Sequence, residues 1–261
     1  MATAFITGAT SGIGLAFAKK LAAEGYDLIL TGRREEKIRK EAHAIEQASG
    51  VKTDIITGDL TDDSVIEEYI RNIRNQQNLD VLINNAGFGV SDYFTDQPGR
   101  VWKDMIKVHI EVPVLLMNAA MEVMKKRKIG IIINISSLAS FFPLPKSAIY
   151  SAAKLFINTL TEAVSLEEQE NIIFKAVCPG FTRTDFHRNM SDTEKEIREN
   201  PIFKWMQPED IVRETWKRLH RGKVIIIPGR RYRFLKAAAS LVPSFLYRKI
   251  MTSKRGRRNE R

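Results

Sequence analysis

The sequence is poor in the residues that cross-link a chain or bind transition metals. Among its 261 residues there is one cysteine, Cys178, so no intramolecular disulfide can form. A lone thiol fits a reducing compartment, and we therefore expect a cytoplasmic protein. The four histidines are scattered without the spacing of a metal site, so we expect no bound metal. They are His43, His109, His187 and His220.

Long hydrophobic runs are also missing. No stretch approaches the roughly 18 consecutive apolar residues that a membrane-spanning helix needs. The first apolar run, residues 2–6, has no basic residue before it and meets a glycine turn almost at once, unlike a secretory signal peptide. These features predict a globular protein without a membrane-spanning segment.

Acidic residues are scarce in one part of the chain. The net charge is +10, but residues 1–227 contain 30 basic and 30 acidic residues and are balanced. Residues 228–261 contain 11 basic residues and one acidic residue, Glu260. The excess charge therefore belongs to a C-terminal extension and gives no reason to expect that the main domain binds nucleic acid.

Short apolar runs alternate with longer amphipathic segments along the rest of the chain. The apolar runs are mostly continuous, as in parallel strands covered on both faces, and their alternation with helices predicts an α/β, doubly wound parallel sheet. We expect one domain over residues 1–227 and a helical, basic extension over residues 228–261. The expected strands are Thr3–Thr7, Asp27–Thr31, Lys52–Thr57, Val81–Asn84, Gly130–Ser136, Ile172–Val177 and Val224–Ile227.

A glycine-rich turn follows the first expected strand and opens the first expected helix. Its glycines permit a tight turn and the close approach of a ligand, and the helix N-terminus offers N–H groups and a positive dipole end to a pyrophosphate. Many strand–helix turns are rich in glycine for steric reasons alone, but the position at the start of the sheet favours a nucleotide site. The residues assigned to it are Gly8, Thr10, Ser11, Gly12, Ile13 and Gly14.

The end of the second expected strand indicates which nucleotide binds. An acidic residue there would hold a ribose 2′-hydroxyl, whereas arginine would meet a 2′-phosphate. The sequence has Arg33 and Arg34 and no acidic group in the turn. These arginines could instead be solvated charges that open the next helix, but their place at the carboxyl end of a strand favours NADP(H) over NAD(H).

Tyr150 and Lys154 lie four residues apart on one expected helix and therefore face the same way. A phenol is a poor base at neutral pH, but a nearby ammonium favours the phenolate and lowers the pKa of the phenol. Tyr150 can then exchange a proton with a carbonyl or an alcohol. Ser137, at the end of the fifth expected strand, can hydrogen-bond the substrate oxygen. Alone, the Tyr150–Lys154 pair would be an ordinary helix face; with Ser137 and the glycine turn it indicates an active site.

These motifs resemble those of the short-chain dehydrogenases/reductases, in that family's order and spacing over about residues 3–227. The glycine turn matches the family's cofactor turn, and Tyr150 to Lys154 matches its catalytic Tyr-x3-Lys. The resemblance implies a Rossmann-type fold, a nicotinamide cofactor, and a second role for Lys154 in holding the nicotinamide ribose. It adds as cofactor-binding positions Asp59, Leu60, Asn84, Ala86, Gly87, Pro179, Gly180, Thr182 and Thr184.

His109 departs from the family pattern. The family carries at this place an asparagine that helps hold a water in a proton relay to the lysine. Histidine can also hydrogen-bond a water and can titrate near neutral pH, so we expect a surviving relay with altered pH dependence. The alternative is that His109 fills the helix interior and the relay is rerouted or weakened.

Two functions follow as hypotheses. The first is an oxidoreductase that transfers a hydride between NADP(H) and a carbonyl or secondary alcohol. Its substrate would be hydrophobic, such as a ketone, a 3-oxoacyl thioester or a steroid-like molecule, because apolar residues 141–145 lie between the catalytic residues. The second is a non-catalytic NADP(H)-binding sensor or regulatory module. Retention of Ser137 favours the enzyme.

The partners are less closely defined. The resemblance implies a homo-oligomer, dimer or tetramer, built through helices near residues 101–127 and 151–170. In the extension, Phe234, Ala238 and Leu241 lie at helical spacing among basic residues. Such a helix can pack against the fold or a partner subunit, which we favour, or make peripheral contact with a membrane; nucleic acid ranks last, and we expect none.

Overall fold

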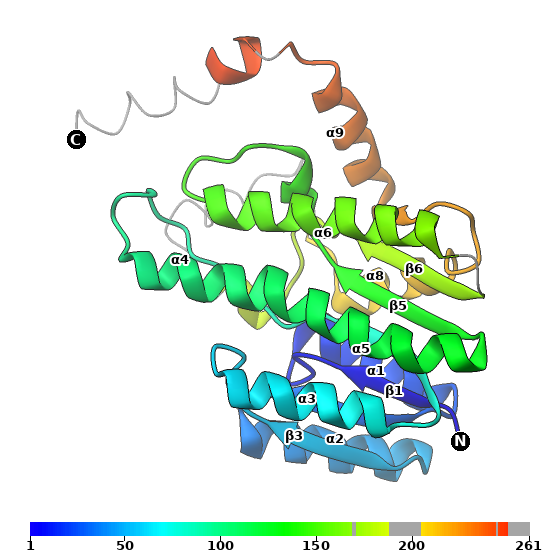
Figure 1. Cartoon of the computed structure of the whole chain (residues 1–261). Coiled ribbons are helices and arrows are strands. Elements are labelled where there is room, and N and C mark those ends of the chain that lie inside the picture. The colour runs from blue at the N-terminus through cyan, green and yellow to red at the C-terminus, as the bar shows by residue number, and fades with distance from the viewer. Residues whose placement is uncertain (169–170, 188–204, 244, 250–261) are drawn as a thin grey trace.

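Seven parallel strands form one sheet in the order β3-β2-β1-β4-β5-β6-β7 (Figure 1). The computed structural model describes residues 1–168, 171–187, 205–243 and 245–249. The predicted strands are confirmed, although the last is shorter than expected. Their bounds are β1 (Thr3–Ile6), β2 (Asp27–Gly32), β3 (Thr53–Thr57), β4 (Leu79–Asn84), β5 (Gly130–Ile135), β6 (Ile172–Val177) and β7 (Ile225–Ile226).

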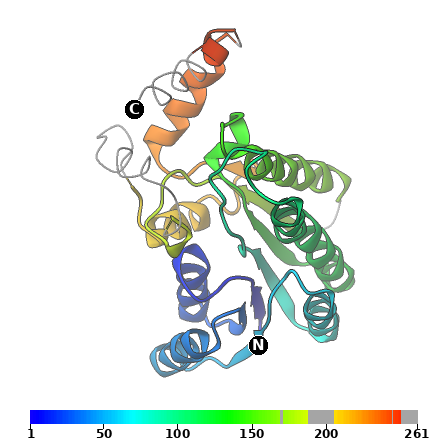
Figure 2. The same cartoon turned by 90° about the vertical axis from the view of Figure 1, so that its left-hand side faces the viewer.

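Helices cover both faces of this sheet, as the turned view shows (Figure 2). On one face lie α1 (Gly12–Ala23), α2 (Glu35–Ser49) and α8 (Pro208–Trp216). On the other lie α3 (Asp63–Asn75), α4 (Gly99–Ile106), the π-helical turn η1 (Lys107–Glu111), α5 (Val112–Arg127) and α6 (Ala148–Glu167). Short 3₁₀ turns follow β5 (η2, Leu138–Phe141) and β6 (η3, Asp185–His187).

The continuous apolar strands explain why both faces are covered. Side chains of successive strand residues point to opposite faces, so Ala4 and Ile6 of β1 pack under α1, whereas Phe5 packs on the opposite side against Tyr69 of α3. All of these side chains are nearly inaccessible to solvent. A hydrophobic core therefore lies on each face of the sheet, and the predicted doubly wound Rossmann-type fold is confirmed.

The chain reverses its direction across the sheet between β1 and β4. From β1 it proceeds through β2 to β3 at one edge, and then returns to β4 on the other side of β1. At such a switch point the connections leave the carboxyl ends of neighbouring strands in opposite directions and leave a crevice between them. The residues predicted to bind a cofactor come from these connections.

The C-terminal extension begins with α9 (Arg230–Ser240), which projects from the main body in both views (Figures 1 and 2). Its Tyr232 is 3% exposed, and the Tyr232 hydroxyl accepts a hydrogen bond of 3.1 Å from the backbone N–H of Phe181. The first turn of the extension therefore packs against the sheet domain. Among the described residues, no helix is both long and apolar enough to span a bilayer.

Candidate active site

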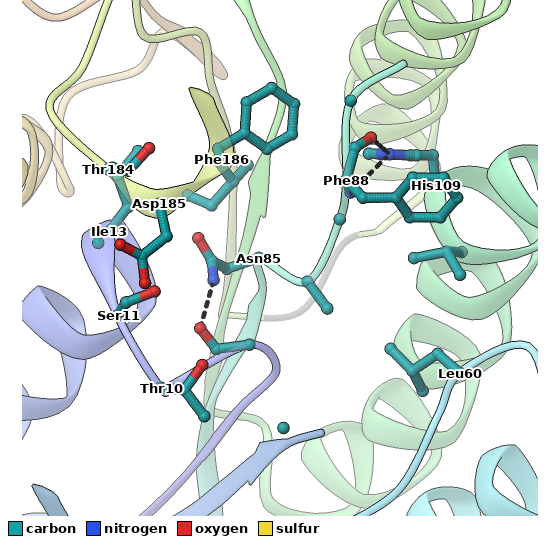
Figure 3. A pocket seen from close by; sticks show the side chains of 18 of the residues that line it. Thr10, Ser11, Ile13, Leu60, Asn85, Phe88, His109, Thr184, Asp185 and Phe186 are labelled. Atoms are coloured by element: carbon teal, nitrogen blue, oxygen red, sulfur yellow. Dashed lines mark hydrogen bonds between the residues drawn. The ribbon is translucent and has the colours of Figure 1, made fainter. Parts of the chain in front are cut away.

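A cavity of about 470 Å³ lies at the carboxyl ends of the strands around the switch point (Figure 3). It brings together residues from the six connections between the seven strands, including all four predicted catalytic residues. The predicted residues that line it are Gly8, Thr10, Ser11, Gly12, Ile13, Arg33, Arg34, Asp59, Leu60, Ala86, Gly87, His109, Ser137, Tyr150, Lys154, Pro179, Gly180, Thr182 and Thr184.

Gly14 and Asn84 are the two predicted cofactor residues that do not line this cavity. A Cβ atom at Gly14 would lie 2.4 Å from the carbonyl oxygen of Gly8, so Gly14 allows α1 to pack closely against the turn. The Asn84 side chain is buried and donates a hydrogen bond of 2.9 Å to Asn134 of the neighbouring strand. Their roles in this structure are to support the cavity wall.

The glycine turn has the shape that a bound phosphate chain requires. Gly8 and Gly12 have φ angles of +67° and +59°, which side chains rarely adopt. A Cβ at Gly8 would lie 2.9 Å from the Cα of Ala86, and one at Gly12 would lie 2.8 Å from the methyl group of Thr184. The turn is therefore a cradle that only glycine can form, opening on the N-terminus of α1. The residues present fit the pyrophosphate of a dinucleotide.

The two arginines after β2 meet carboxylates. Arg34 donates 2.8 Å hydrogen bonds to the hydroxyls of Thr10 and Ser11 and a further one of 2.8 Å to Asp185. Arg33 is more exposed and lies 3.2 Å from a carboxylate oxygen of Asp59. The guanidinium of Arg34 is thus held beside the glycine turn, at the position where the sequence predicts a 2′-phosphate.

Tyr150 lies on the cavity side of α6 and is partly exposed there. Burial raises the pKa of its phenol to about 12, and a hydrogen bond with Ser137 acts in the opposite direction. The expectation of a lowered pKa for Tyr150 is wrong for the structure, because the loss of solvent outweighs the favourable interactions of the phenolate. At neutral pH Tyr150 therefore carries its proton.

Lys154 is 6% exposed, and its ammonium donates a hydrogen bond of 2.8 Å to the carbonyl of Ile135. The ammonium lies 5.7 Å from the centre of the Tyr150 ring. Burial lowers the pKa of Lys154 to about 8, so this lysine loses its charge at a lower pH than an exposed lysine does. Ser137 lies at the end of β5, where its hydroxyl accepts a hydrogen bond of 3.1 Å from the backbone of Ala139.

His109 lies on η1, and its ring is 1% exposed. The ring meets the edge of Tyr150 with centroids 5.5 Å apart, and its Nε2 lies 2.7 Å from the carbonyl oxygen and 3.2 Å from the N–H of Phe88. Burial first, and then the charge of Lys154, lower the pKa of His109 to about 3. The expectation that His109 titrates near neutral pH is therefore wrong: the imidazole stays neutral because its site is dry and next to a cation.

A second, much smaller cavity lies behind the catalytic residues. Its volume is about 10 Å³, close to the smallest space that can hold one water molecule. His109, Lys154 and Asn84 line it, and among the described residues neither His109 Nδ1 nor Asn84 Oδ1 has a hydrogen-bond partner. The pocket therefore offers polar atoms to a single water beside the catalytic lysine.

Sequence reasoning missed several residues of the main cavity. Asn85 donates hydrogen bonds of 2.9 and 3.0 Å to the carbonyls of Thr7 and Gly8 and so holds the glycine turn; Figure 3 draws one of these two bonds. Asp185 holds Arg34, and the ring of Phe186 lies 5.6 Å from that of Tyr150. Asn85 lies between the predicted residues Asn84 and Ala86 and could have been found; the other two lie in a loop whose path the sequence does not reveal.

The segment at residues 185–206 lies mostly outside the described residues. At its base, Thr182 and Met206 form an isolated parallel bridge. The apolar loop at residues 141–145, expected to line a substrate pocket, is not among the residues that line the main cavity. It lies instead beside α9, where the Lys236 ammonium lies 5.5 Å from the centre of the Phe141 ring.

Comparison with known proteins matches this geometry to a family. The family model for short chain dehydrogenase matches residues 2–195. A very-long-chain 3-oxoacyl-CoA reductase of Anas platyrhynchos is 34% identical over 217 residues, which are 81% of this chain and 67% of that protein.

Two solved structures are also similar. A short-chain dehydrogenase from Sphingobium yanoikuyae in complex with NADPH has a TM-score of 0.81 at 28% identity, covering 94% of this chain and 97% of that one. A bulky-bulky ketone specific alcohol dehydrogenase from Comamonas testosteroni has a TM-score of 0.78 at 27% identity, covering 94% of this chain and 96% of that one.

Proposed function

The chain belongs to the short-chain dehydrogenase/reductase family, and from this premise we propose that it transfers a hydride between NADP(H) and a hydrophobic carbonyl or secondary alcohol. One observation carries the proposal: Ser137, Tyr150 and Lys154 line the same cavity as a glycine turn shaped for a pyrophosphate. A protein that only bound the nucleotide would have no need of Ser137 and Tyr150 at this place.

The protonation states favour carbonyl reduction at neutral pH. Tyr150, with a pKa raised to about 12, donates its phenolic proton to the substrate oxygen. The Ser137 hydroxyl hydrogen-bonds the same oxygen, where negative charge develops. Lys154, charged below a pKa of about 8, has its ammonium 5.7 Å from the centre of the Tyr150 ring and stabilises the phenolate that remains. Bound NADPH supplies the hydride.

The proton that Tyr150 gives up has to be replaced. We propose that a water in the small cavity hydrogen-bonds His109 Nδ1 and passes a proton towards Lys154, as the family's asparagine-held water would. His109 acts as a neutral hydrogen-bonding group in this step, because its pKa of about 3 keeps it uncharged.

The preference for NADP(H) rests on charge at the end of β2. Arg34 is held beside Thr10 and Ser11 and can turn its guanidinium to a phosphate in bidentate fashion. The similar structure from Sphingobium yanoikuyae contains NADPH. Because the end of β2 carries Gly32-Arg33-Arg34 and no carboxylate, a 2′-hydroxyl would lack its usual acceptor there.

An apolar substrate is supported by the rings around Tyr150. Phe186 and Phe88 lie on two sides of the catalytic centre and line the cavity. The names of two similar proteins refer to bulky ketones and to very-long-chain 3-oxoacyl-CoA. We therefore propose a bulky ketone or a 3-oxoacyl thioester.

The assembly and its location complete the proposal. On α6, Leu155 and Phe156 are 52% and 41% exposed, and Leu115 of α5 is 37% exposed. These apolar side chains support a homo-oligomer built through α5 and α6, as family members commonly form. The buried free thiol of Cys178 is consistent with a cytoplasmic location.

The test is NADPH oxidation, followed by nicotinamide absorbance, over a panel of aldehydes, bulky ketones and 3-oxoacyl thioesters, with NADH in parallel. Tyr150→Phe should abolish turnover and leave NADPH binding intact. Tyr26→Phe, which removes a phenol outside the cavity, is the matched control. Tight NADPH binding without Tyr150-dependent turnover would contradict the oxidoreductase and favour the non-catalytic NADP(H)-binding sensor.

A further inference from the structure

The extension is attached to the sheet domain along one side. Tyr232 is buried against the turn at Gly180, where a Cβ atom would lie 2.3 Å from its ring. Farther along, the Tyr247 hydroxyl donates a hydrogen bond of 2.8 Å to the carbonyl of Pro143. Arg233, one residue after Tyr232, pairs with Glu214 of α8 at 3.2 Å. These contacts fix which side of α9 faces outward.

The outward side of α9 is apolar. Phe234 and Leu241 are 72% and 84% exposed, and with Ala237 and Ala238 they recur at the spacing of one helical face. Phe245, 73% exposed, follows in the next turn of chain. We call this set the tail face. Large apolar side chains that are so exposed on a projecting helix indicate a surface that binds another molecule or a membrane.

Basic residues accompany the tail face. Arg230 and Arg231 are exposed at the first turn of α9, next to Phe234 along the helix. The whole extension from residue 228 has 11 basic residues against one acidic residue, whereas the preceding 227 residues are balanced. The partner that binds the tail face therefore has to accommodate apolar side chains and carry negative charge.

We propose that the tail face docks on an anionic membrane surface. A basic helix with an exposed apolar stripe lies in the interface of such a membrane, where apolar side chains enter the acyl boundary and basic side chains meet lipid headgroups. A second copy of the chain would bring two strongly cationic extensions together. A nucleic acid would satisfy the arginines but would leave Phe234 and Leu241 in water.

Docking of this kind would place the loop beside the catalytic serine close to the bilayer. The extension contacts this loop through Lys236 over Phe141 and through Tyr247 at Pro143. Its base touches Gly180, which lines the catalytic cavity. An apolar substrate dissolved in the membrane would then be near the cavity, but the docking itself does not depend on the reaction.

The test is sedimentation of the full-length protein with vesicles of phosphatidylcholine, alone or mixed with phosphatidylglycerol. The protein should bind the anionic vesicles much more than the neutral ones, and binding should weaken as salt screens the charges. Replacing Arg230 and Arg231 by Gln should lower the partition coefficient roughly 25-fold, on the expectation of about fivefold for each removed charge. Lys103→Gln with Lys126→Gln is the matched control at exposed positions of α4 and α5.

The apolar contribution is tested separately with Phe234→Ser and Leu241→Ser together. Binding should be lost while circular dichroism and melting stay unchanged, because both side chains are exposed. Leu166→Ser, at a residue 85% exposed on α6, controls for the loss of surface hydrophobicity and should bind normally. Equal binding to neutral and anionic vesicles, or no binding at low salt, would overturn the proposal. So would a dimer that these tail substitutions dissociate, seen by light scattering, because a second copy would then cover the face.

Discussion

The carboxylate of Asp185 lies 2.8 Å from the guanidinium of Arg34, although 151 residues separate them in the chain. Lys37 reaches the same carboxylate at 3.1 Å, and these cations lower the pKa of Asp185 to about 2. Asp185 therefore stays ionised and occupies Arg34, to which we assign the cofactor's 2′-phosphate. A phosphate that reaches Arg34 has to compete with a carboxylate of the protein.

Asp185→Asn should for this reason strengthen NADPH binding. The Arg34–Asp185 pair is partly exposed, and pairs of this kind contribute about 0.2–1 kcal/mol, so the Kd for NADPH should fall by about 1.5- to 5-fold. NADH, which lacks the phosphate, should be almost unaffected. Titration by fluorescence or calorimetry measures both constants. Weaker NADPH binding in the variant would mean instead that Asp185 positions Arg34 for the phosphate.

Arg34→Gln should reverse the cofactor preference. Hydrogen bonds to a charged partner contribute about 1.5–3 kcal/mol, so the Kd for NADPH should rise roughly 10- to 150-fold. NADH binding should change little, because the hydroxyls of Thr10 and Ser11 remain. Arg39→Gln on the same helix, where Arg39 pairs with Glu35 in solvent, is the control. An equal loss for both cofactors would assign Arg34 to the shape of the turn and not to the phosphate.

The pH dependence of carbonyl reduction should follow Lys154. Tyr150 keeps its proton up to a pKa of about 12, and His109 is neutral above a pKa of about 3, so neither changes charge near neutrality. Lys154 has a lowered pKa of about 8; its ammonium is present below that pH and is lost above it. The value of kcat/KM should thus be level near neutral pH and fall above about pH 8.

This expectation is tested by measuring rates over a pH series with saturating NADPH. A control shows that the enzyme stays active after incubation at each pH. The fall should stay at the same pH in His109→Asn, because a neutral histidine contributes no titration there. A change in kcat/KM near pH 6 that disappears in His109→Asn would show that the histidine does titrate. In that case the environment of the ring differs when the cofactor is bound.

Local patterns in the sequence were sufficient to predict the strands and most of the cavity, for physical reasons. Parallel strands need continuous apolar runs, and a Gly8–Gly12 turn of this shape admits few other residues, so both leave clear signals. The pKa values could not be predicted in the same way. The proximity of Lys154 to Tyr150 follows from helical spacing, but the loss of solvent that raises the pKa of Tyr150 depends on every element packed around it.

The partnership of Asp185 with Arg34 was also invisible in the sequence. It depends on the path of the chain after β6, and no periodicity specifies that path. The same holds for Phe186, which follows Asp185 in this segment and lies with its ring 5.6 Å from that of Tyr150. Contacts between distant loops of this kind are set by the tertiary structure and have no local pattern.

His109 supplies a further prediction, about positioning. Its Nε2 lies within hydrogen-bond distance of the backbone of Phe88, and its ring meets Tyr150 edge-on. A Cβ at Gly87 would lie 2.5 Å from the ring, so the segment before Phe88 is shaped around the imidazole. His109→Phe keeps an aromatic ring but leaves the backbone polar groups of Phe88 without their partner. Such a loss costs about 1–3 kcal/mol.

His109→Phe should therefore melt at a lower temperature, by roughly 2–4 °C for each kcal/mol lost in a chain of this size. Its kcat should fall more than its affinity for NADPH, because the ring that supports Tyr150 changes its position while the glycine turn does not. His109→Gln, whose amide can both donate and accept, should recover part of the melting temperature and of kcat. Scanning fluorimetry and steady-state kinetics on the three proteins decide the matter. If His109→Phe melts and turns over like the parent protein, the hydrogen bonds to Phe88 contribute nothing, and His109 fills space beside Tyr150 without positioning it.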